Sequence, residues 1–360
     1  MRILVLNTYS FDKIYQEWLD GESPSHFLFG TLEVNKHDGF QADILPHSKY
    51  KWLNKIGDFI GLTGLDQQVR VLMQIRKYDI IYAPFALGNT RLLNILKYFR
   101  IINTPIVILG HMNLYIKPEK PVFFDFRKKL LLDYNKIAFL SEGLMNKTIN
   151  DLGVSKSELN DRFTKVNWGA DVNFHKKNES YVNSRDTQFA ICAGTTDRDF
   201  ELVIEAFREI DFPLEIYCTP ATRPNDTNLP DHISINSDFV PYIDLLRRYQ
   251  KARFILIPIK KEKVETGRTL GLTVLLDSLA INKPAIMTYN KYVDINPEDH
   301  GFGLSVHGFT VEEWRKAINS ILFDFEKLDK MASNANALYV SEYNSERFGD
   351  SLVKVFKEIK

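Results

Sequence analysis

Short runs of apolar residues alternate along the chain with longer segments in which apolar residues recur every three or four positions. The first run, 1–6, ends in polar Asn7 and Thr8, as expected for a buried strand that opens into a loop. Segments such as 65–76 and 90–99 have helical spacing. Strands that alternate with helices predict an α/β protein with parallel sheets covered on both faces. The other predicted strands are 80–84, 106–110, 137–141, 189–193, 214–218, 254–258 and 285–288, with one more inside 233–239.

The alternation pauses near 166–171, and the segment 176–186 is polar and charged. The pattern then starts again, which predicts two domains that close about a linker at 172–187. Ligands bind at the carboxyl ends of the strands in open parallel sheets, and two such sheets can turn those ends toward one cleft. The later predicted helices are 200–209, 242–250, 272–280, 310–323, 326–340 and 345–360. The predicted domains are 1–175, 186–342 and a terminal helix over 343–360.

Composition narrows the function classes. The length of 360 residues suits two domains of about 150–200 residues each. Lys and Arg together number 46, as do Asp and Glu, so the formal net charge is zero. This balance argues against a protein that coats nucleic acid, and we expect no nucleic-acid partner. The two cysteines, Cys192 and Cys218, lie in apolar runs, which fits buried thiols in a reducing compartment.

The chain offers no obvious membrane anchor. Its first residues lack the apolar core of a signal peptide, and the most apolar window, 92–109, is interrupted by charges and a proline. We therefore expect a cytoplasmic protein. Basic residues lie beside aromatic ones in the first domain, which indicates either solvated helix faces or a peripheral contact with the inner membrane face, worth about 1 kcal/mol per basic residue. These residues are Lys49, Lys51 and Lys55 beside Trp52, and Arg127, Lys128 and Lys129 beside Phe123, Phe124 and Phe126.

The segment 193–200 joins a predicted strand to a predicted helix through Gly194 and Thr195. A tight turn of this kind leaves backbone N–H groups unpaired at a helix N-terminus, which is a ready site for an anion. Arg198 adds a permanent charge and a fork of donors suited to phosphate. In the alternative interpretation Asp197 only caps the helix, which would begin near it, and Arg198 is solvated.

A second loop, 267–273, leads into the predicted helix 272–280 and offers N–H and hydroxyl groups to a phosphate. Asp277 is the single acid of that helix, and its carboxylate could accept hydrogen bonds from sugar hydroxyls. It could equally be an acid placed favourably near a helix N-terminus. Two helix starts suited to anions in one α/β half predict a diphosphate ligand. No His and Cys residues have zinc spacing, and no P-loop lysine motif occurs, so we expect no bound metal and no cofactor.

The order of these features resembles that of the retaining glycosyltransferases of family 4, which have the GT-B fold. The resemblance spans nearly the whole chain and is strongest from 137 to 285. In the first half, segment 138–142 resembles the family's strand ending in Ser-Glu, and segment 166–174 resembles its turn before the linker. In the second half, segment 194–206 resembles the phosphate loop, segment 238–246 resembles the segment whose backbone holds the nucleotide base, and segment 271–284 resembles the donor-binding helix. Segment 343–359 resembles the family's last helix, which crosses back onto the first domain.

The resemblance implies two Rossmann-like parallel-sheet domains that face a central cleft. It also implies a metal-independent hexosyltransferase that moves a sugar from a nucleotide-diphosphate sugar to a hydroxyl acceptor with retention. The acceptor would be a glycan or a lipid-linked glycan, as in surface polysaccharide or glycolipid assembly. The donor would be the co-substrate, and no cofactor would be needed.

The family's functional residues carry over to particular positions. Arg198 would stabilise charge on the leaving diphosphate, Asp277 would hold donor hydroxyls, and His111, at the end of strand 106–110, would contact the donor sugar. The other donor-binding residues implied are Gly194, Thr195, Phe239, Val240, Arg268, Thr269, Gly271, Leu272 and Thr273.

The chain also departs from the family's pattern. Thr269 stands at the first of two glutamates, Thr195 stands where an arginine is typical, and the loop 7–11 lacks a glycine pair. Arg268 could restore the missing charge. Asp197-Arg-Asp199 spells an acid–x–acid motif that holds a metal in other glycosyltransferases, although the arginine inside it favours phosphate. Two other functions stay open: a non-catalytic nucleotide-sugar-binding partner or sensor, and a sugar-nucleotide epimerase on the same fold.

Overall fold

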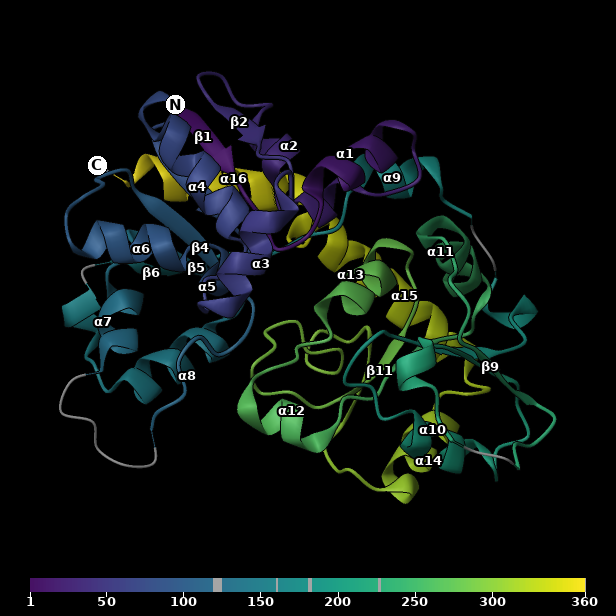
Figure 1. Ribbon diagram of the computed structural model, residues 1–360. Coiled ribbons are helices and arrows are strands. Elements are labelled where there is room, and N and C mark those ends of the chain that lie inside the picture. Colours follow the sequence, from purple (N-terminus) through teal and green to yellow (C-terminus); the bar gives the residue numbers. More distant parts are fainter. Residues whose placement is uncertain (119–124, 160, 181–182, 226–227, 360) are drawn as a thin grey trace. The chain divides into compact units, whose positions relative to one another are not determined.

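The structure is a computed structural model that describes residues 1–118, 125–159, 161–180, 183–225 and 228–359 (Figure 1). Phe123 and Phe124, named above beside the basic residues, lie outside this part. The chain forms two compact units, one of Met1–Trp168 with Ser345–Lys360 and one of Gly169–Asn344. Within the described residues no helix is long and apolar enough to cross a membrane.

The first unit is built on a parallel sheet with the strand order β2-β1-β3-β4-β5-β6. The central strands are buried along their whole length, which explains their continuous apolar sequence. The strands are β1 (Arg2–Val5), β2 (Gln41–Ile44), β3 (Ile80–Ala83), β4 (Ile106–Gly110), β5 (Lys136–Phe139) and β6 (Phe163–Lys165). The helices are α1 (Phe11–Leu19), α2 (Thr31–Val34), α3 (Lys51–Phe59), α4 (Leu65–Gln74), α5 (Ala86–Asn89), α6 (Arg91–Tyr98), α7 (Phe126–Leu132), α8 (Glu142–Leu152) and α16 (Ser345–Lys357).

The second unit repeats this plan with the strand order β12-β11-β10-β7-β8-β9, again parallel throughout. Its core packs Phe200, Phe207, Phe254 and Trp314 between sheet and helices. The strands are β7 (Ala190–Ala193), β8 (Leu214–Tyr217), β9 (Ile233–Asn236), β10 (Ile255–Ile257), β11 (Ala285–Thr288) and β12 (Gly303–Val306). The helices are α9 (Val172–Lys177), α10 (Phe200–Phe207), α11 (Tyr242–Lys251), α12 (Lys261–Thr266), α13 (Leu272–Ala280), α14 (Val311–Asn319) and α15 (Phe325–Ser341).

The predicted fold class, two α/β units with parallel sheets, is confirmed. Sequence analysis missed β2, β6 and β12, which lie at sheet edges, where exposed positions break the apolar run. The predicted helix 310–323 ends earlier, at Asn319. Cys192 and Cys218 are buried free thiols.

The segment predicted as a linker, 172–187, begins with a helix of the second unit. Asp171 starts α9 by accepting hydrogen bonds from the backbone N–H groups of Asn173 and Phe174 at 2.9 and 3.1 Å. The unit boundary lies at Trp168, before the predicted domain end at residue 175.

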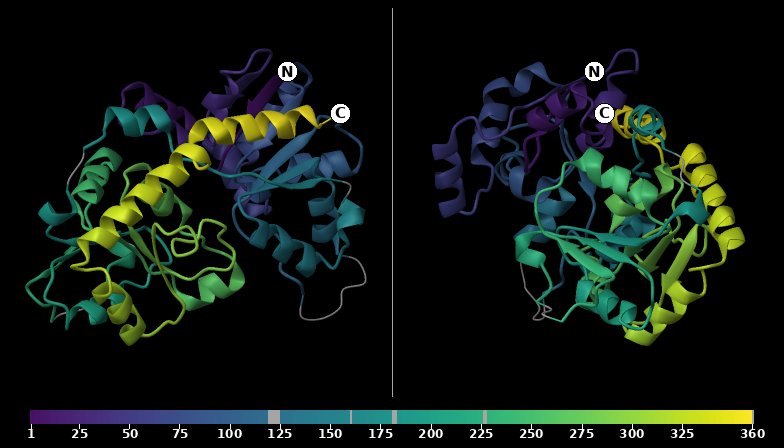
Figure 2. Two further views of the ribbon diagram at one scale, coloured as in Figure 1. Left: turned by 180° about the vertical axis from the view of Figure 1, so that it is seen from behind. Right: turned by 90° about the vertical axis from the view of Figure 1, so that its right-hand side faces the viewer.

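The terminal helix α16 is part of the first unit, where it lies against α2 (Figure 2). The approach is close because two glycines permit it. A Cβ at Gly30 would lie 2.5 Å from Leu352 Cδ1, and one at Gly349 would lie 2.4 Å from Glu33 Cβ. The last helix therefore packs within the first unit, although most of that unit lies far from the helix in sequence.

Candidate functional site

The loops that follow β7 and β10 meet at the carboxyl edge of the second sheet. These strands are neighbours, so their ends lie side by side. The N–H of Asp199 donates to the carbonyl of Pro258 at 3.0 Å, and that of Lys260 donates to the carbonyl of Asp197 at 3.1 Å. The two loops thus form one platform at the edge where open parallel sheets bind ligands.

Asp197 is the polar centre of this platform. Its backbone is left-handed, with φ of 57°, which aspartate tolerates better than most residues. Its carboxylate accepts a hydrogen bond from Thr269 Oγ1 at 2.5 Å and pairs with Lys263 Nζ at 3.3 Å. Partial burial favours the neutral form, but the hydrogen bond from Thr269 and the charge of Lys263 outweigh it and lower the pKa of Asp197.

Arg198 is the unusual residue of the platform. It is 8% exposed, and its Nε has no hydrogen-bond partner among the described residues. The side chain lies against Gly194: a Cβ there would stand 2.7 Å from Arg198 Cγ and 2.9 Å from its Nε. Burial lowers the pKa of the guanidinium, so its charge is held in surroundings that penalise it. A buried cation without a hydrogen-bonded partner is suited to receive an anion.

The helix after this loop begins at Phe200, and Asp199 caps it, since its side chain accepts from Leu202 N at 3.2 Å. The predicted start of the helix 200–209 is confirmed, and the alternative interpretation, in which the helix begins near Asp197 and that residue caps it, is wrong. Asp197 and Asp199 hold different partners instead of converging on one point. Within the described part of the chain, no three or more His, Cys, Asp or Glu residues are grouped to hold a metal ion.

The second predicted phosphate loop lies beside the first. Gly271 precedes α13 with φ of 74°, and a Cβ there would stand 3.0 Å from Ile259 Cδ1. This position therefore requires glycine for both backbone conformation and close packing. Asn290 Nδ2 donates to the carbonyl of Thr269 at 3.0 Å and ties the loop to the end of β11. Leu272 is buried, while Arg268 and Thr273 are exposed.

Asp277 lies inside the unit and is 2% exposed. It accepts a hydrogen bond from Tyr242 Oη at 2.6 Å, which joins α13 to α11. Burial raises its pKa to about 7, although the hydrogen bond from Tyr242 opposes the shift. Its observed partner is thus a tyrosine of its own unit, and the predicted contact with sugar hydroxyls stays a prediction.

Phe239 and Val240 follow β9, at the edge of the sheet. Phe239 is 92% exposed, and Val240 is partly buried. Because β8 separates β9 from β7, the two strand ends are about 10 Å apart at the usual strand spacing. The span from Arg198 toward Phe239 therefore suits a ligand with a charged part and a flat part.

The carboxyl edge of the first sheet has a different chemistry. His111 follows β4, and its ring centroid lies 4.2 Å from that of Phe85, which follows β3. Burial lowers the pKa of His111 to about 4, so the imidazole is neutral at neutral pH. Asn7, after β1, is buried, with its side-chain amide near Tyr9. At the ends of β1, β3 and β4 this edge therefore carries an amide, an aromatic ring and a neutral imidazole.

The structure brings Gly194, Thr195, Arg198, Thr269 and Gly271 to one edge of the second sheet, with Arg268 on the same loop as Thr269. His111 belongs to the first unit. Sequence analysis missed Lys263, whose signal was its place in the polar loop directly after β10.

No family model matches the chain, and no curated protein matches it. Solved structures do. HepE from Anabaena, in complex with UDP-glucose, matches with a TM-score of 0.64 at 12% identity over 99% of each chain. Sucrose-phosphate synthase from Thermosynechococcus elongatus matches with 0.66 at 13% identity, over 99% of this chain and 98% of that one. WaaG, a glycosyltransferase involved in lipopolysaccharide biosynthesis, matches with a TM-score of 0.60 at 11% identity, over 99% of this chain and 100% of that one. These likenesses show that the chain has the GT-B fold.

Proposed function

We propose that the protein transfers a sugar from a nucleotide-diphosphate sugar to a hydroxyl acceptor. One observation carries the proposal: Arg198 is a buried cation whose Nε has no hydrogen-bond partner among the described residues, and it lies just before α10, at the carboxyl ends of the strands, where ligands bind. A diphosphate would supply the missing partner with the right charge and geometry. The fold supports this interpretation, since HepE was solved with UDP-glucose bound.

The catalytic contribution would be electrostatic. Negative charge grows on the diphosphate as the sugar leaves, and donors fixed in advance stabilise it without reorganisation. Arg198 supplies the buried charge, while Lys263 on α12 and Arg268 on the loop after that helix add charge nearby. The N–H of Gly194 donates to the carbonyl of Tyr217 at 3.0 Å, so the backbone N–H groups that follow Gly271, at the start of α13, would complete the set. These groups can neutralise a diphosphate by themselves, so we propose that transfer needs no metal and no cofactor.

The donor's base would lie at the carboxyl edge of the second sheet as well. We propose that the backbone at Phe239 and Val240 holds the base, because this segment follows β9 at a distance that suits a nucleoside. His111 would offer a neutral imidazole to a sugar hydroxyl, one nitrogen donating or accepting. Retention of configuration, a hexosyl group and an acceptor in surface polysaccharide or glycolipid assembly complete the proposal. They are supported by the sequence resemblance and by the fold that the chain shares with WaaG.

The experiment has two stages. Thermal melting is measured with UDP, GDP, ADP, CMP and TDP, with and without magnesium. A ligand at 100 times its dissociation constant stabilises the native state by about 2.7 kcal/mol, a shift of several degrees. The matching nucleotide sugar is then incubated with glycan and lipid-linked acceptors, and the anomeric configuration of the product is read by NMR.

Each result decides between the candidates. A shift with one diphosphate, without metal, followed by sugar transfer, supports the proposal. Binding without any transfer would favour the sensor, and an epimerised sugar formed without acceptor would favour the epimerase. No shift with any nucleotide would contradict the donor site.

A further inference from the structure

Helix α3 exposes its apolar side chains. Of its residues only Gly57 is buried, whereas Trp52 is 61% and Phe59 91% exposed. Ile56 and the following Ile60 are exposed as well. Helices on the surface of a globular protein normally turn their apolar stripe toward the core. In α3 only Leu53 among the apolar side chains is partly buried, so apolar burial alone holds this helix weakly.

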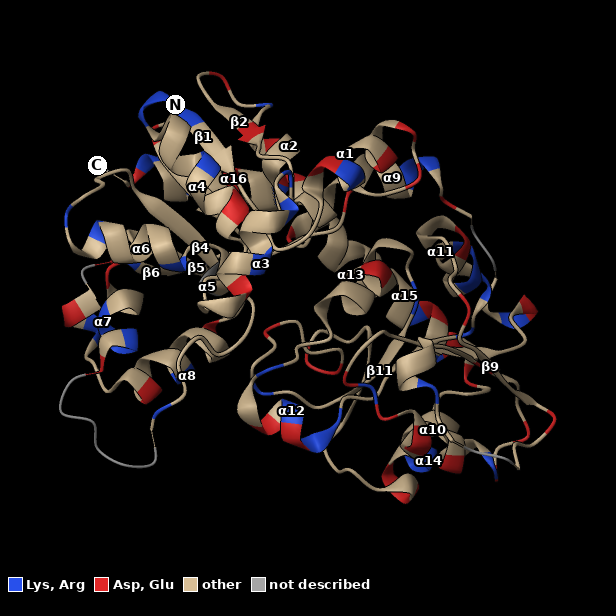
Figure 3. Cartoon of the chain, viewed as in Figure 1, with Lys and Arg blue, Asp and Glu red and all other residues tan. Residues whose placement is uncertain are grey.

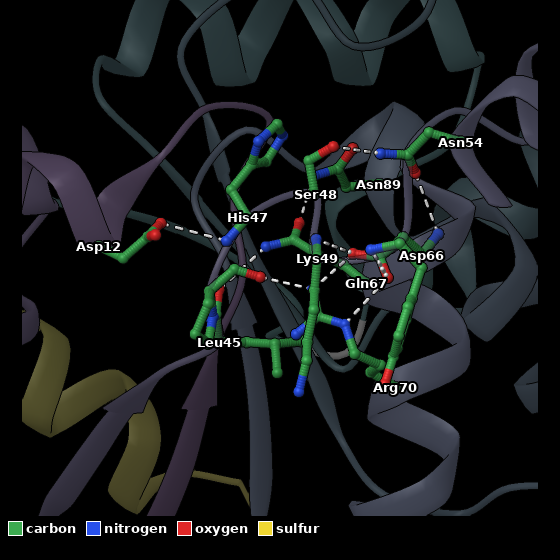
Figure 4. A network of polar contacts seen from close by, with 12 residues as sticks. Asp12, Leu45, His47, Ser48, Lys49, Asn54, Asp66, Gln67, Arg70 and Asn89 are labelled. Atoms are coloured by element: carbon green, nitrogen blue, oxygen red, sulfur yellow. Dashed lines mark hydrogen bonds and ion pairs between the residues drawn. The ribbon is translucent and has the colours of Figure 1, made fainter. Parts of the chain in front are cut away.

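A polar network fastens this helix to the first unit (Figure 4). The buried carboxylate of Asp66 accepts the backbone N–H groups of Lys49 and Tyr50 at 2.9 and 3.0 Å, just before the helix begins. The same carboxylate pairs with Arg70 at 2.5 Å. Within the helix, Asn54 Oδ1 accepts from the N–H of Asp66 at 3.0 Å. Burial opposes ionisation of Asp66, but the hydrogen bonds from Arg70 and from the Tyr50 and Lys49 N–H groups prevail and lower its pKa.

Gly57 fixes which face of α3 turns inward. A Cβ at this position would lie 2.4 Å from the carbonyl oxygen of Leu62 and 2.6 Å from Leu65 Cβ, so the helix approaches the next segment closely there. With about 3.6 residues per turn, Trp52, Ile56 and Phe59 form one strip on the sides away from Gly57. The close packing at Gly57 thus keeps the apolar strip on the outward face of α3.

Basic residues border this strip. Lys51 and Lys55 lie beside Trp52 and Phe59 at helical spacing, and Lys49 precedes the helix with its ammonium 5.6 Å from the ring centroid of Tyr50. Figure 3 shows basic residues, in blue, at this part of the first unit. Asp58 is the one acid of α3, so the surface keeps a positive balance. We name this set, Lys49, Tyr50, Lys51, Trp52, Lys55, Ile56, Phe59 and Ile60, the α3 surface.

We propose that the α3 surface docks on a lipid bilayer that contains anionic lipids. An interfacial helix places apolar side chains among the acyl chains near the headgroups and its lysines on anionic phosphates. Trp52 and Tyr50 have the part-apolar, part-polar rings suited to that depth. A second copy of the chain fits the surface less well, since a two-fold contact would set the lysines of one copy against those of the other.

The proposal is independent of sugar transfer, and its test needs no nucleotide. The full-length protein is sedimented with vesicles of phosphatidylcholine alone and of phosphatidylcholine with about one quarter phosphatidylglycerol, at about 0.1 M and about 0.5 M salt. Two variants alter the α3 surface: Trp52→Ser with Phe59→Ser, and Lys51→Glu with Lys55→Glu. Two matched controls change exposed residues elsewhere: Ile101→Ser, and Lys36→Glu with Lys330→Glu.

We expect binding to the anionic vesicles, at least tenfold weaker at the higher salt and at least tenfold weaker in both α3 variants, with both controls like the wild type. Circular dichroism and melting should show that all variants fold, because the changed side chains are exposed. No binding of the wild type to anionic vesicles would overturn the proposal, and so would equal binding by the α3 variants. A change of oligomeric state in those variants, without vesicle binding by the wild type, would assign the surface to a second copy instead.

Discussion

Two buried arginines lie at opposite ends of the strands of the second sheet, Arg253 at the amino ends and Arg198 at the carboxyl ends, and their surroundings differ. Arg253, just before β10, is 6% exposed and donates from Nε to Thr187 Oγ1 at 3.2 Å and from Nη1 to the Leu322 carbonyl at 3.0 Å. Its guanidinium also lies 4.4 Å from the ring centroid of Phe212. Arg198, after β7, is 8% exposed, but its Nε has no hydrogen-bond partner within the described residues.

The difference teaches how one fold separates structure from function. Burying a charge costs several kcal/mol unless hydrogen bonds compensate it. At the amino edge the protein supplies this compensation to Arg253 itself, so the residue stabilises the fold. At the carboxyl edge it leaves the Nε of Arg198 without a hydrogen bond to the part of the chain that the structure describes, which is tolerable where a ligand brings the acceptor. The loops at the carboxyl ends of the strands are the proposed binding site, whereas Arg253 at the amino ends stabilises the fold.

The largest expected effect comes from replacing each arginine by methionine. Arg253→Met leaves buried carbonyls without donors and should lower stability by about 3 kcal/mol, a drop in Tm of about 6–12 °C. Arg198→Met removes an uncompensated charge and should leave Tm unchanged or raised. Its affinity for the nucleotide diphosphate should nevertheless fall about 100-fold. Thermal melting and ligand titration of both variants test whether stability falls only in Arg253→Met and whether affinity falls in Arg198→Met. A large stability loss in Arg198→Met would show that Arg198 is structural too.

The next effect follows from crowding Arg198 without removing it. In Gly194→Ala the new methyl group would overlap Arg198 Cγ, at 2.7 Å, and displace the guanidinium. The affinity for diphosphate should fall about tenfold, because the charge remains but its geometry is lost. Gly88→Ala is the control, since its Cβ would meet Thr63 at an ordinary 3.6 Å. Unchanged affinity in Gly194→Ala would mean that the observed position of Arg198 is irrelevant to binding.

Lys263 tests the contribution of exposed charge at the same edge. Lys263→Met should weaken diphosphate binding about fivefold and reduce its dependence on salt, since the lysine is partly solvated and screened. Lys261→Met, on the same helix α12 but paired with Glu265, is the control. An equal loss of diphosphate affinity in both variants would indicate that the positive charge of α12 as a whole, instead of a contact by Lys263, favours binding.

The last expected effect, measured as a slope of stability against pH instead of a loss at one pH, comes from Asp277. Its pKa of about 7 in the folded protein exceeds the usual value, so the unfolded chain releases this proton first. Stability is thus fully present below about pH 4 and is lost as pH rises through 7, by up to about 1.4 kcal/mol per pH unit. Asp277→Asn keeps an acceptor for Tyr242 and removes this loss. Tm measured from pH 5 to 8 should fall more steeply in the wild type, and parallel curves would contradict the buried acid.

The fold could be predicted from sequence because buried parallel strands have continuous apolar runs. β3, β4 and β10 carry that signal, whereas the edge strands β2, β6 and β12 do not, since part of each faces solvent. The lysines beside Trp52 indicated an exposed face of α3, but not what holds it outward. The hydrogen bond between Asn54 and Asp66, in the following helix, needed the structure.

The candidate site was predictable in part. Glycines and an arginine between a strand and a helix indicated the anion loop, and the parallel order of β7 and β10 joins it to the loop holding Thr269. The depth of Asp277 was not predictable, because a single acid in an apolar helix has the same pattern whether it faces a ligand or Tyr242. The partner of Asp197, Lys263, needed the geometry of two loops that sequence spacing does not fix.

The most direct test of the account is a calorimetric titration of nucleoside mono- and diphosphates into the wild type and Arg198→Met, with a chelator present. The account predicts that one diphosphate binds the wild type, more tightly than its monophosphate, and about 100-fold more weakly in Arg198→Met. Equal affinity in both proteins, or equal affinity for the mono- and diphosphate, would contradict the assignment of Arg198 to a diphosphate.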